Sequence, residues 1–360
     1  MVDLSFYKGK TVLVTGHTGF KGTWLCKILL LVGAKVIGYS LNPPTNPSLY
    51  ELSKIDSKIT SVIGDIRDFD KLKETFTKYK PEIVLHLAAQ PIVRESYKEP
   101  RYTYEVNVMG TCNVLECVRL TSSVKSFLNV TTDKVYKNDE LKDHAFKEDE
   151  PLDGFDPYSN SKSCSELVTH SYKKSFFSDR DCSISTARAG NVIGGGDFSI
   201  DRIIPDCVRA IENKKDIVVR NPYSTRPYQF VLEPLFVYLE ICEKQYNNKK
   251  YEGYYNVGPD NQDCINTGDL VSLFCKEYGN NLKWINKSDS GPHEASFLKL
   301  DNQKIKEVFN WKPHCHINEA IKFIIDWTKV YLSNGDISNE MKKEINVFRG
   351  AEYVSNKRGY

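Results

Sequence analysis

A glycine-rich turn near the amino terminus restricts the fold of this chain more than any other feature. The run Gly16-His17-Thr18-Gly19-Phe20-Lys21-Gly22 follows the pattern GxxGxxG, between a β-branched run at residues 11–15 and an apolar helical run at residues 23–32. Glycines in this context allow a sharp turn, close approach of the backbone to a pyrophosphate, and tight packing of helix on strand. The helix amino terminus then faces the phosphates. The pattern predicts a dinucleotide site.

Strand-like and helix-like segments alternate through the first half of the chain. Strands are expected at residues 11–15, 35–39, 60–63, 82–87, 126–131 and 183–189, and helices at residues 23–32, 69–80, 107–121 and 161–175. Strands separated by helices of this length indicate a parallel sheet with right-handed crossovers. The predicted fold class is therefore α/β, with a Rossmann-type doubly wound parallel sheet.

The alternation ends near Gly194. Glycine-rich, proline-rich and aromatic segments follow, with short helices expected at residues 205–213, 268–277 and 317–332. We expect a dinucleotide-binding domain at residues 1–192, to which part of residues 220–245 returns. A smaller C-terminal substrate-binding lobe is expected at residues 193–350. The polar tail from Glu340 is expected to be loosely held.

Composition excludes several classes of partner. Lysine plus arginine number 49 and aspartate plus glutamate 47, a net charge of +2 that favours neither nucleic acid nor an anionic membrane. No segment approaches the roughly 18 to 20 apolar residues that span a bilayer, and the amino terminus lacks the apolar core of a signal peptide. Ten scattered cysteines without a CxxC pair fit reduced thiols in a cytoplasmic protein. No metal site is expected, because side chains alternate along His314-Cys315-His316.

The expected cofactor is NAD. The second strand ends at Ser40 without the acidic residue about 20 positions after the glycines that would bind the adenosine ribose. It also has no arginine for the 2′-phosphate of NADP, so NAD is preferred while NADP stays open. The predicted cofactor-binding residues are Gly16, Thr18, Gly19, Phe20, Gly22, Ser40, Asp65, Ile66, Leu87, Ala88, Ala89, Asn107, Tyr158 and Lys162.

A candidate proton-transfer pair lies at the start of an expected helix. Tyr158 and Lys162 form YxxxK, and their i, i+4 spacing places both side chains on one face of the helix. An ammonium group beside a phenol stabilises the phenolate and lowers its pKa, so the tyrosine can accept a hydroxyl proton near neutral pH. YxxxK alone is weak, but the glycine motif and Thr131-Thr132 should lie at the same edge of the sheet.

Together these motifs resemble the extended short-chain dehydrogenase/reductases that act on nucleotide sugars. The likeness rests on GxxGxxG, Leu87-Ala88-Ala89-Gln90, Asn107-Val108-Met109-Gly110-Thr111 and the Tyr158/Lys162 pair. It covers nearly the whole chain. Further stretches resemble the CDP-glucose 4,6-dehydratase branch: Gln90–Arg94, 187–197, 226–234 and His293-Glu294-Ala295. One departure is Phe230, where that branch has histidine, which leaves a substrate contact or a packing detail there open.

The resemblance implies roles for the residues of the expected strand end. Thr132 matches the hydroxyl residue that joins the tyrosine and lysine, and Asp133 and Lys134 follow it. A hexose would be oxidised at C4, lose water across C5 and C6, and be reduced at C6, with NAD regenerated. Asp133 would be the acid at O6. Lys134 stands where the C5 base is expected, but an amine must lose its charge to act as a base.

The partner implied is CDP-glucose or a related nucleotide sugar. The candidate substrate-binding residues are Gln90, Arg94, Asn191, Arg202 and Arg226, among which Arg226 is preferred as a charge-assisted diphosphate clamp. Arg188 is expected to be structural. A nucleotide-sugar 4-epimerase and a 4,6-dehydratase of a GDP- or dTDP-sugar remain alternatives, as does a non-catalytic dinucleotide sensor. The family also implies a homodimer or higher homo-oligomer, paired through residues 107–121 and 161–175.

Overall fold

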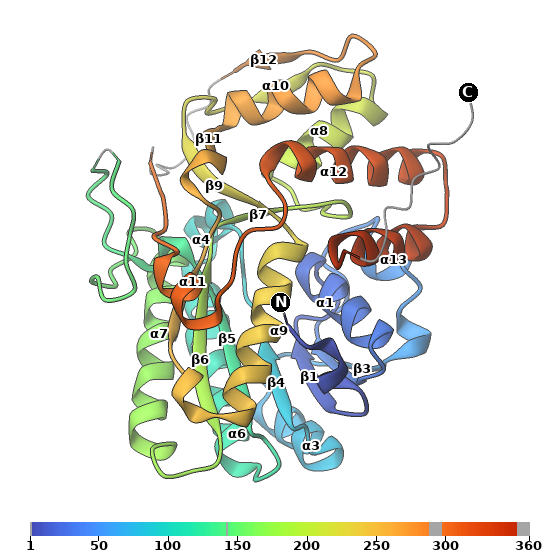
Figure 1. Cartoon of the computed structure of the whole chain (residues 1–360). Helices are drawn as coiled ribbons and strands as arrows, with labels where there is room; N and C mark the ends of the chain where they lie inside the picture. Colours follow the sequence, from blue (N-terminus) through green and yellow to red (C-terminus); the bar gives the residue numbers. More distant parts are fainter. Residues whose placement is uncertain (1, 142, 288–296, 351–360) are drawn as a thin grey trace.

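The computed structural model describes residues 2–141, 143–287 and 297–350 and is built on a seven-stranded parallel sheet (Figure 1). The strand order is β10-β6-β5-β4-β1-β2-β3. The strands are β1 (Thr11–Thr15), β2 (Lys35–Ser40), β3 (Thr60–Ile63), β4 (Ile83–His86), β5 (Ser126–Thr132), β6 (Ser183–Ala189) and β10 (Tyr254–Val257). Every pairing in it is parallel. The predicted doubly wound α/β fold is confirmed.

Helices cover both faces of this sheet. One face packs on α1 (Phe20–Leu31) and α9 (Leu232–Asn247), and the other on α3 (Phe69–Tyr79), α6 (Thr111–Leu120) and α7 (Pro157–Phe176). In β1, Val12 and Val14 belong to the first core and Leu13 to the second. This alternation follows from the two-residue period of a strand, and burial on both faces explains the nearly continuous apolar runs.

The order of the strands places a crevice in the middle of the sheet. The chain winds outward from β1 to β3 and then returns to β4 on the other side of β1. In open α/β sheets, ligands bind at the carboxyl ends of the strands where the order reverses in this way. The glycine-rich loop after β1 and the alanines after β4 meet at this point, where a Cβ on Gly16 would lie 2.8 Å from the amide nitrogen of Ala88.

The remaining elements form a smaller part, at the top of Figure 1. It contains the sheet β11-β9-β7 and the pair β12-β8. Its elements are β7 (Asn191–Ile193), α8 (Ile203–Glu212), β8 (Ile217–Val219), β9 (Thr225–Phe230), β11 (Cys264–Asn266), α10 (Thr267–Tyr278), β12 (Trp284–Asn286) and α12 (Ile317–Leu332). The short helices α2 (Leu49–Leu52), α4 (Val93–Lys98), α5 (Pro100–Tyr104) and α11 (Gln303–Phe309) join the larger units.

Two sequence expectations need correction after residue 193. The return to the large sheet extends to Val257, because the aromatic and β-branched run of β10 pairs with β6. The tail from Glu340 is not loose as far as the described residues reach: it belongs to α13 (Ile337–Phe348). Ile337, Met341 and Ile345 recur at helical spacing and are buried, with α1 and α12 as neighbours. The charged residues between them hid this apolar stripe.

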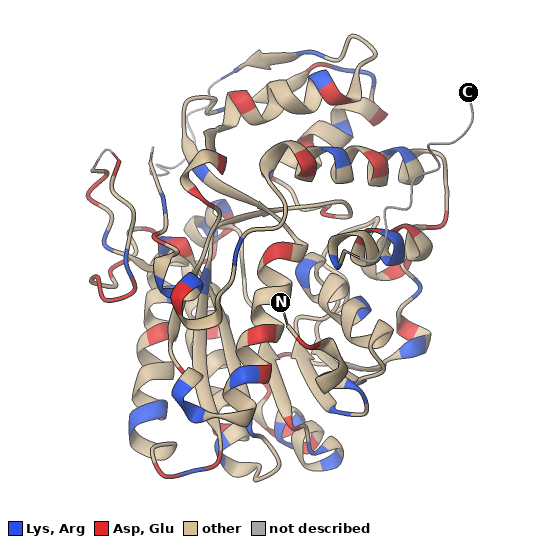
Figure 2. Ribbon diagram, in the orientation of Figure 1, with Lys and Arg blue, Asp and Glu red and all other residues tan. Residues whose placement is uncertain are grey.

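Charges of both signs are interspersed over both parts of the molecule (Figure 2). No helix in the described part of the chain has the length and apolar character that a membrane crossing requires. All ten cysteines are free thiols. Within the described residues, no three histidine, cysteine, aspartate or glutamate side chains gather as a metal site would need.

Candidate active site

A cavity of about 730 Å³ lies between the carboxyl edge of the large sheet and the smaller sheets. Its walls come from segments far apart in the sequence, including the ends of β4 and β5, the start of α7, and strands β7 and β9. The predicted catalytic residues Thr132, Asp133, Lys134, Tyr158 and Lys162 all line it. The cavity therefore joins the two motifs that the sequence places at the same edge of the sheet.

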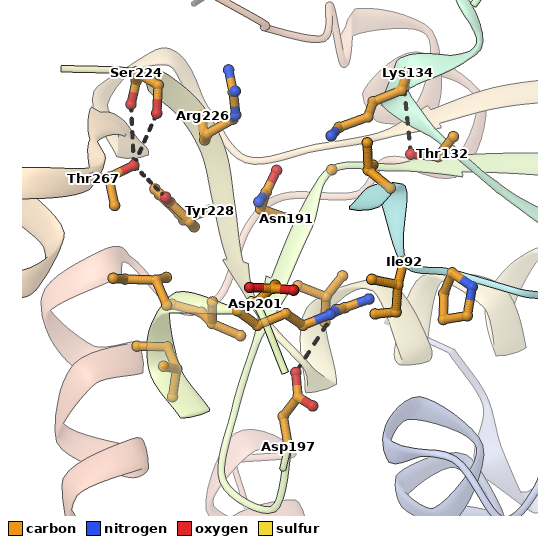
Figure 3. A pocket seen from close by; sticks show the side chains of 18 of the residues that line it. Ile92, Thr132, Lys134, Asn191, Asp197, Asp201, Ser224, Arg226, Tyr228 and Thr267 are labelled. Atoms are coloured by element: carbon orange, nitrogen blue, oxygen red, sulfur yellow. Dashed lines mark hydrogen bonds and ion pairs between the residues drawn. The ribbon is translucent and has the colours of Figure 1, made fainter. Parts of the chain in front are cut away.

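The end of β5 delivers three of these side chains through a tight turn. Thr132 is the last residue of the strand, and a 3-10 turn, Asp133–Val135, follows directly. The Thr132 hydroxyl donates to Asp133 Oδ1 at 2.9 Å and accepts from the backbone N–H of Lys134 at 3.4 Å. In Figure 3 the Lys134 side chain extends from this turn toward the middle of the cavity, on the side where Asn191 lies. The turn thus presents a hydroxyl, a carboxyl and an amine to one space.

The environment of Asp133 favours the protonated form of its carboxyl. Its side chain is 2 % exposed, and Oδ2 has no hydrogen-bond partner among the described residues. Burial raises the pKa of the Asp133 carboxyl, against the opposing effects of Lys134, Thr132 and Arg226. A buried carboxyl with a raised pKa is suited to serve as a general acid.

Replacing this carboxyl by an amide should stabilise the fold. Because the folded-state pKa of Asp133 is raised, its charged form costs stability above the unfolded-state pKa. We expect Asp133→Asn to raise the melting temperature at pH 7 by about 2 to 4 °C while lowering turnover. Thermal melts of both proteins from pH 3 to 8 test this, and the difference should close at low pH, where both side chains are neutral. A lower melting temperature of the variant at pH 7 would contradict the assignment.

Helix α7 places the tyrosine and lysine. It begins with Pro157 in its first turn, and the Asp156 carboxylate caps it by accepting from the N–H of Ser159 at 3.0 Å. Lys162 donates to the carbonyl of Val130 in β5 at 3.2 Å, which ties the helix face to the strand end. Tyr158 and Lys162, one turn apart on α7, therefore both line the cavity.

The expected lowering of the tyrosine pKa is wrong for this structure. Burial raises the pKa of Tyr158 to about 12, although a hydrogen bond with Thr132 and the charge of Arg202 lower it. Burial also lowers the pKa of Lys162 to about 7, and the charge of Lys21 acts in the same direction. Removal from water outweighs the neighbouring charges in both groups, which the i, i+4 spacing alone does not reveal.

The glycine-rich loop has the shape that a pyrophosphate needs. Gly16 has a φ of +76°, a conformation that favours glycine. A Cβ on Gly22 would lie 2.1 Å from the carbonyl oxygen of Gly16, whereas one on Gly19 would lie 3.4 Å from that atom. The roles predicted for Gly16 in the turn and for Gly22 in packing fit this geometry, and the first turn of α1 leaves its N–H groups available to an anion.

The Cβ distances at Gly22 and Gly19 predict different effects of an alanine at each position. Gly22→Ala should destabilise the protein by about 3 kcal/mol, because backbone must move to admit the methyl group. Gly19→Ala should fold normally but bind NAD more weakly if the pyrophosphate passes close to that position. Thermal melts and NAD titration of both variants test this. Normal stability of Gly22→Ala would contradict the packing role.

Some of the other predicted cofactor residues lie at the cavity or next to the glycine-rich loop, and the rest lie in the core or at a separate hollow. Thr18 and Ser40 join through their hydroxyls at 2.9 Å, and Leu87 and Ala89 line the cavity while Ala88 packs beside Gly16. The Phe20 side chain packs in the core, so only its backbone can face the loop. Ile66 is buried. Asp65 lies at a separate hollow beside α6 and forms an ion pair with Arg67 at 2.7 Å.

Asn107 and Gln90 lie behind the cavity wall. Asn107 accepts from the N–H of Gln90 at 2.8 Å and donates to the carbonyl of Gln90 and to the Ser161 hydroxyl. The Gln90 amide donates to Thr103 at 2.8 Å and accepts from the N–H of Ile92. Neither residue lines the 730 Å³ cavity. Their side chains pin the loop after β4 to α7.

The candidate diphosphate ligands all line the cavity: Arg94, Asn191, Arg202 and Arg226. Arg226, on β9, is 4 % exposed and donates to the Thr225 carbonyl at 3.2 Å. Arg202 lies 3.8 Å from Asp197. Arg188 instead forms a buried ion pair with Glu166 at 3.0 Å, as expected for a structural residue.

Sequence reasoning missed several cavity residues: Lys21, Asp197, Asp201, Arg220, Tyr228 and Thr267. Lys21 lies inside the glycine motif, and Asp197 and Tyr228 lie in the stretches 187–197 and 226–234 that resemble the family, so these positions were the available signal. No motif marks Asp201, Arg220 or Thr267. Phe230 is a packing residue, since its ring stacks on Phe323 with centroids 4.9 Å apart. The His293-Glu294-Ala295 stretch lies outside the described residues.

Relatives of known activity share this chain's sequence over nearly its full length. A family model described as GDP-mannose 4,6 dehydratase matches residues 13–324. The chain is 43% identical over 357 residues to CDP-glucose 4,6-dehydratase of Salmonella typhimurium, covering 98% of this chain and 99% of that protein. It is 26% identical over 344 residues to dTDP-D-glucose 4,6-dehydratase of Mus musculus, covering 90% of each.

Solved structures share the fold. UDP-glucose 4-epimerase of Thermotoga maritima superimposes with a TM-score of 0.77 at 20% identity, covering 89% of this chain and 99% of that one. The dTDP-glucose 4,6-dehydratase of Bacillus anthracis in complex with NAD gives 0.74 at 20% identity, covering 92% and 100%. Because the family match spans most of the chain and a 43% identical relative aligns almost end to end, this chain belongs, as its motifs predict, to the nucleotide-sugar 4,6-dehydratases of the extended short-chain dehydrogenase/reductase family.

Proposed function

We propose that this protein converts CDP-glucose to CDP-4-keto-6-deoxyglucose with NAD as its resident cofactor. The observation that carries the proposal is the convergence of Thr132, Asp133, Lys134, Tyr158 and Lys162 on one cavity. The 43% identity to a CDP-glucose 4,6-dehydratase favours CDP-glucose over other nucleotide sugars. The proposal divides the chain into a cofactor-binding part around the large sheet and a substrate-binding part formed by the smaller sheets.

The glycine-rich loop would hold the NAD pyrophosphate through Gly16, Gly19 and the first turn of α1, with Leu87 and Ala89 along the path toward Tyr158. Bound there, NAD would supply the hydride acceptor for C4 of the sugar and the hydride donor for C6. A solved relative of the same fold was determined in complex with NAD. The ribose contact would come from the Thr18 and Ser40 hydroxyls in place of an acidic side chain.

The chain's own groups supply the proton transfers. Tyr158 would accept the proton of the C4 hydroxyl. The positive charges of Lys162 and of bound NAD would have to stabilise its phenolate against the burial that raises its pKa to about 12. The resulting ketone makes the C5 proton acidic, and the amine of Lys134 would remove it. Asp133, whose pKa burial raises, would protonate O6 as water leaves. The amine would then return this proton to C5 as C6 receives the hydride, and the proton that Tyr158 takes from the C4 hydroxyl balances the one that Asp133 gives to the leaving water.

The diphosphate needs cations at the opposite side of the cavity. Arg226 and Arg202 can form charge-assisted hydrogen bonds to phosphate oxygens, and Asn191 can donate from its amide. Arg94 provides a further cation from α4. These side chains come from both parts of the molecule, so substrate binding should hold the two parts together.

The test is to incubate the purified protein with CDP-glucose and follow the alkaline chromophore of the 4-keto product. Parallel reactions with dTDP-, GDP- and UDP-sugars establish which nucleotide is preferred. We expect the highest kcat/KM with CDP-glucose. Epimerisation at C4 without loss of water would replace the proposal by a 4-epimerase, which needs Thr132, Tyr158 and Lys162 but not Asp133 and Lys134. Nucleotide binding without turnover on any sugar would indicate a non-catalytic sensor.

We further propose that the protein forms a homo-oligomer and resides in the cytoplasm. Exposed apolar side chains on and next to α6 and on α7 (Met109, Leu120, Leu167 and Phe176) offer a surface for a second copy. Ten free thiols fit a reducing compartment. Light scattering of the purified protein measures the oligomeric state, and a monomer at micromolar concentration would argue against the pairing.

A further inference from the structure

Lys21 is a cation inside the reaction cavity that the proposed chemistry does not use. It belongs to the glycine-rich run and lies in the first turn of α1, yet it lines the same cavity as Asp133, Tyr158 and Lys162. The side chain is partly exposed to that space. The loop that is shaped for the cofactor phosphates therefore also sends an amine toward the reacting groups.

The ammonium group of Lys21 has no hydrogen bond or ion pair with any residue that the structure describes. Two lysines outside the cavity differ: Lys10 pairs with Glu82 at 2.9 Å, and the buried Lys27, further along α1, donates to Ser338 at 2.7 Å. A partly buried charge without a partner is costly unless neighbouring groups or a ligand compensate it. We therefore expect groups or a ligand in the cavity to interact with the Lys21 charge.

Four charged groups act on Lys21 from the elements around it. Arg202, at the start of α8, repels it, while Asp133 after β5 and Asp197 before α8 attract it. Lys162 on α7 is the fourth, because the Lys21 charge disfavours the charged form of Lys162. Burial and Arg202 lower the pKa of Lys21 to about 8. Lys21 is therefore coupled to both the acid and the lysine of the proton-transfer site.

We propose that Lys21 is a positioning residue of the reaction site, whose ammonium group sets the protonation of Asp133 and Lys162 and so determines the pH range of water elimination. The proposal rests on the function proposed above. A cation at this place favours the Asp133 carboxylate and the neutral form of Lys162. Losing it raises the pKa of both groups, so the whole pH–rate profile must move in one direction.

Lys21→Met removes the charge and keeps an unbranched side chain of similar length. We expect both limbs of its kcat profile with CDP-glucose to move to higher pH by about one unit. The KM and the NAD content of the purified protein should stay near the wild-type values. Lys21→Gln should give the same displacement, and Lys21→Arg, which keeps the charge, should restore the wild-type profile. Lys27→Met is the matched control, since it is the same substitution on the same helix outside the cavity, and its profile should not move.

A second measurement does not depend on turnover. Because the folded-state pKa of Lys21 lies below that of an ordinary lysine, its charge costs stability at neutral pH and this cost disappears as pH rises through the unfolded-state pKa, about 10.4. Lys21→Met should therefore melt about 2 to 4 °C higher than wild type at pH 7, with a smaller difference toward pH 10. The melts use the protein as purified.

Three results would overturn the proposal. A pH–rate profile of Lys21→Met that coincides with wild type would show that the charge does not act on the proton transfers. A lower melting temperature at pH 7 together with loss of bound NAD would make Lys21 a phosphate ligand. A higher KM with an unmoved profile would make it a substrate contact. If wild type turns over no nucleotide sugar, the proposed function fails, and the melting comparison still decides whether Lys21 carries an uncompensated charge.

Discussion

Tyr158→Phe is expected to reduce the rate of 4-keto sugar formation by roughly 10² to 10⁴, the contribution that a positioned proton-transfer group makes. The substitution keeps the ring and removes the hydroxyl that would accept the C4 hydroxyl proton. Its hydrogen bond with Thr132 is lost, but Thr132 keeps its bond to Asp133 at 2.9 Å. The fold should persist, because α7 is held by its cap, by the Lys162 bond to Val130 and by its apolar face. The measurement is kcat with CDP-glucose, with a thermal melt and the NAD content of the same preparation.

Tyr104→Phe is the matched control for this experiment. The Tyr104 hydroxyl donates to Asn160 on α7 at 3.0 Å but does not line the cavity. Tyr104→Phe, like Tyr158→Phe, removes a phenolic oxygen, and it also removes a hydrogen bond to α7. Because Tyr104 lies outside the cavity, the turnover of this variant should stay within about twofold of wild type while its stability falls slightly. Comparable rates for Tyr158→Phe and Tyr104→Phe would remove Tyr158 from the proton transfers.

Lys134→Met should separate oxidation of the sugar from loss of water. Without the amine, we expect formation of the 4-keto-6-deoxy product to fall by roughly 10² to 10⁴. In the proposed reaction, oxidation at C4 depends on Tyr158, Thr132 and Lys162, which this variant retains, so absorbance of reduced nicotinamide should appear when CDP-glucose is added. The methionine chain fills a similar volume and keeps the cavity wall packed. Single-turnover absorbance and the product chromophore are measured on the same sample.

Lys137→Met provides the comparison for Lys134→Met. Lys137 is exposed, follows the same turn and lies 4.0 Å from Asp139. Its substitution should leave both oxidation and water loss unchanged. Wild-type turnover in Lys134→Met would exclude the amine as the C5 base, and loss of both steps would indicate a role in binding the sugar instead.

The sheet and the main motifs could be predicted from the sequence because their signals are local. The strands at residues 11–15, 60–63 and 183–189 have the predicted bounds, since short β-branched runs between helices carry their own pattern. The positive φ of Gly16 and the one-turn spacing of Tyr158 and Lys162 also follow from a few neighbouring positions. Strand β10 and helix α13 were not predicted, because a four-residue strand and a helix with charged residues along its apolar stripe leave weak patterns.

The amino-acid sequence by itself determined the doubly wound sheet, the glycine loop at its switch point and the family to which the chain belongs. Only the tertiary structure decided which side chains share the cavity. Lys21 meets Asp133 and Lys162 there, whereas the Asn107 and Gln90 side chains form hydrogen bonds with other protein groups behind its wall. Burial also reversed the direction expected for the pKa of Tyr158. Hydropathy period and motif spacing act between near neighbours, but desolvation and charge coupling depend on segments that folding brings together from more than 100 positions apart, as with Lys21 and Lys162.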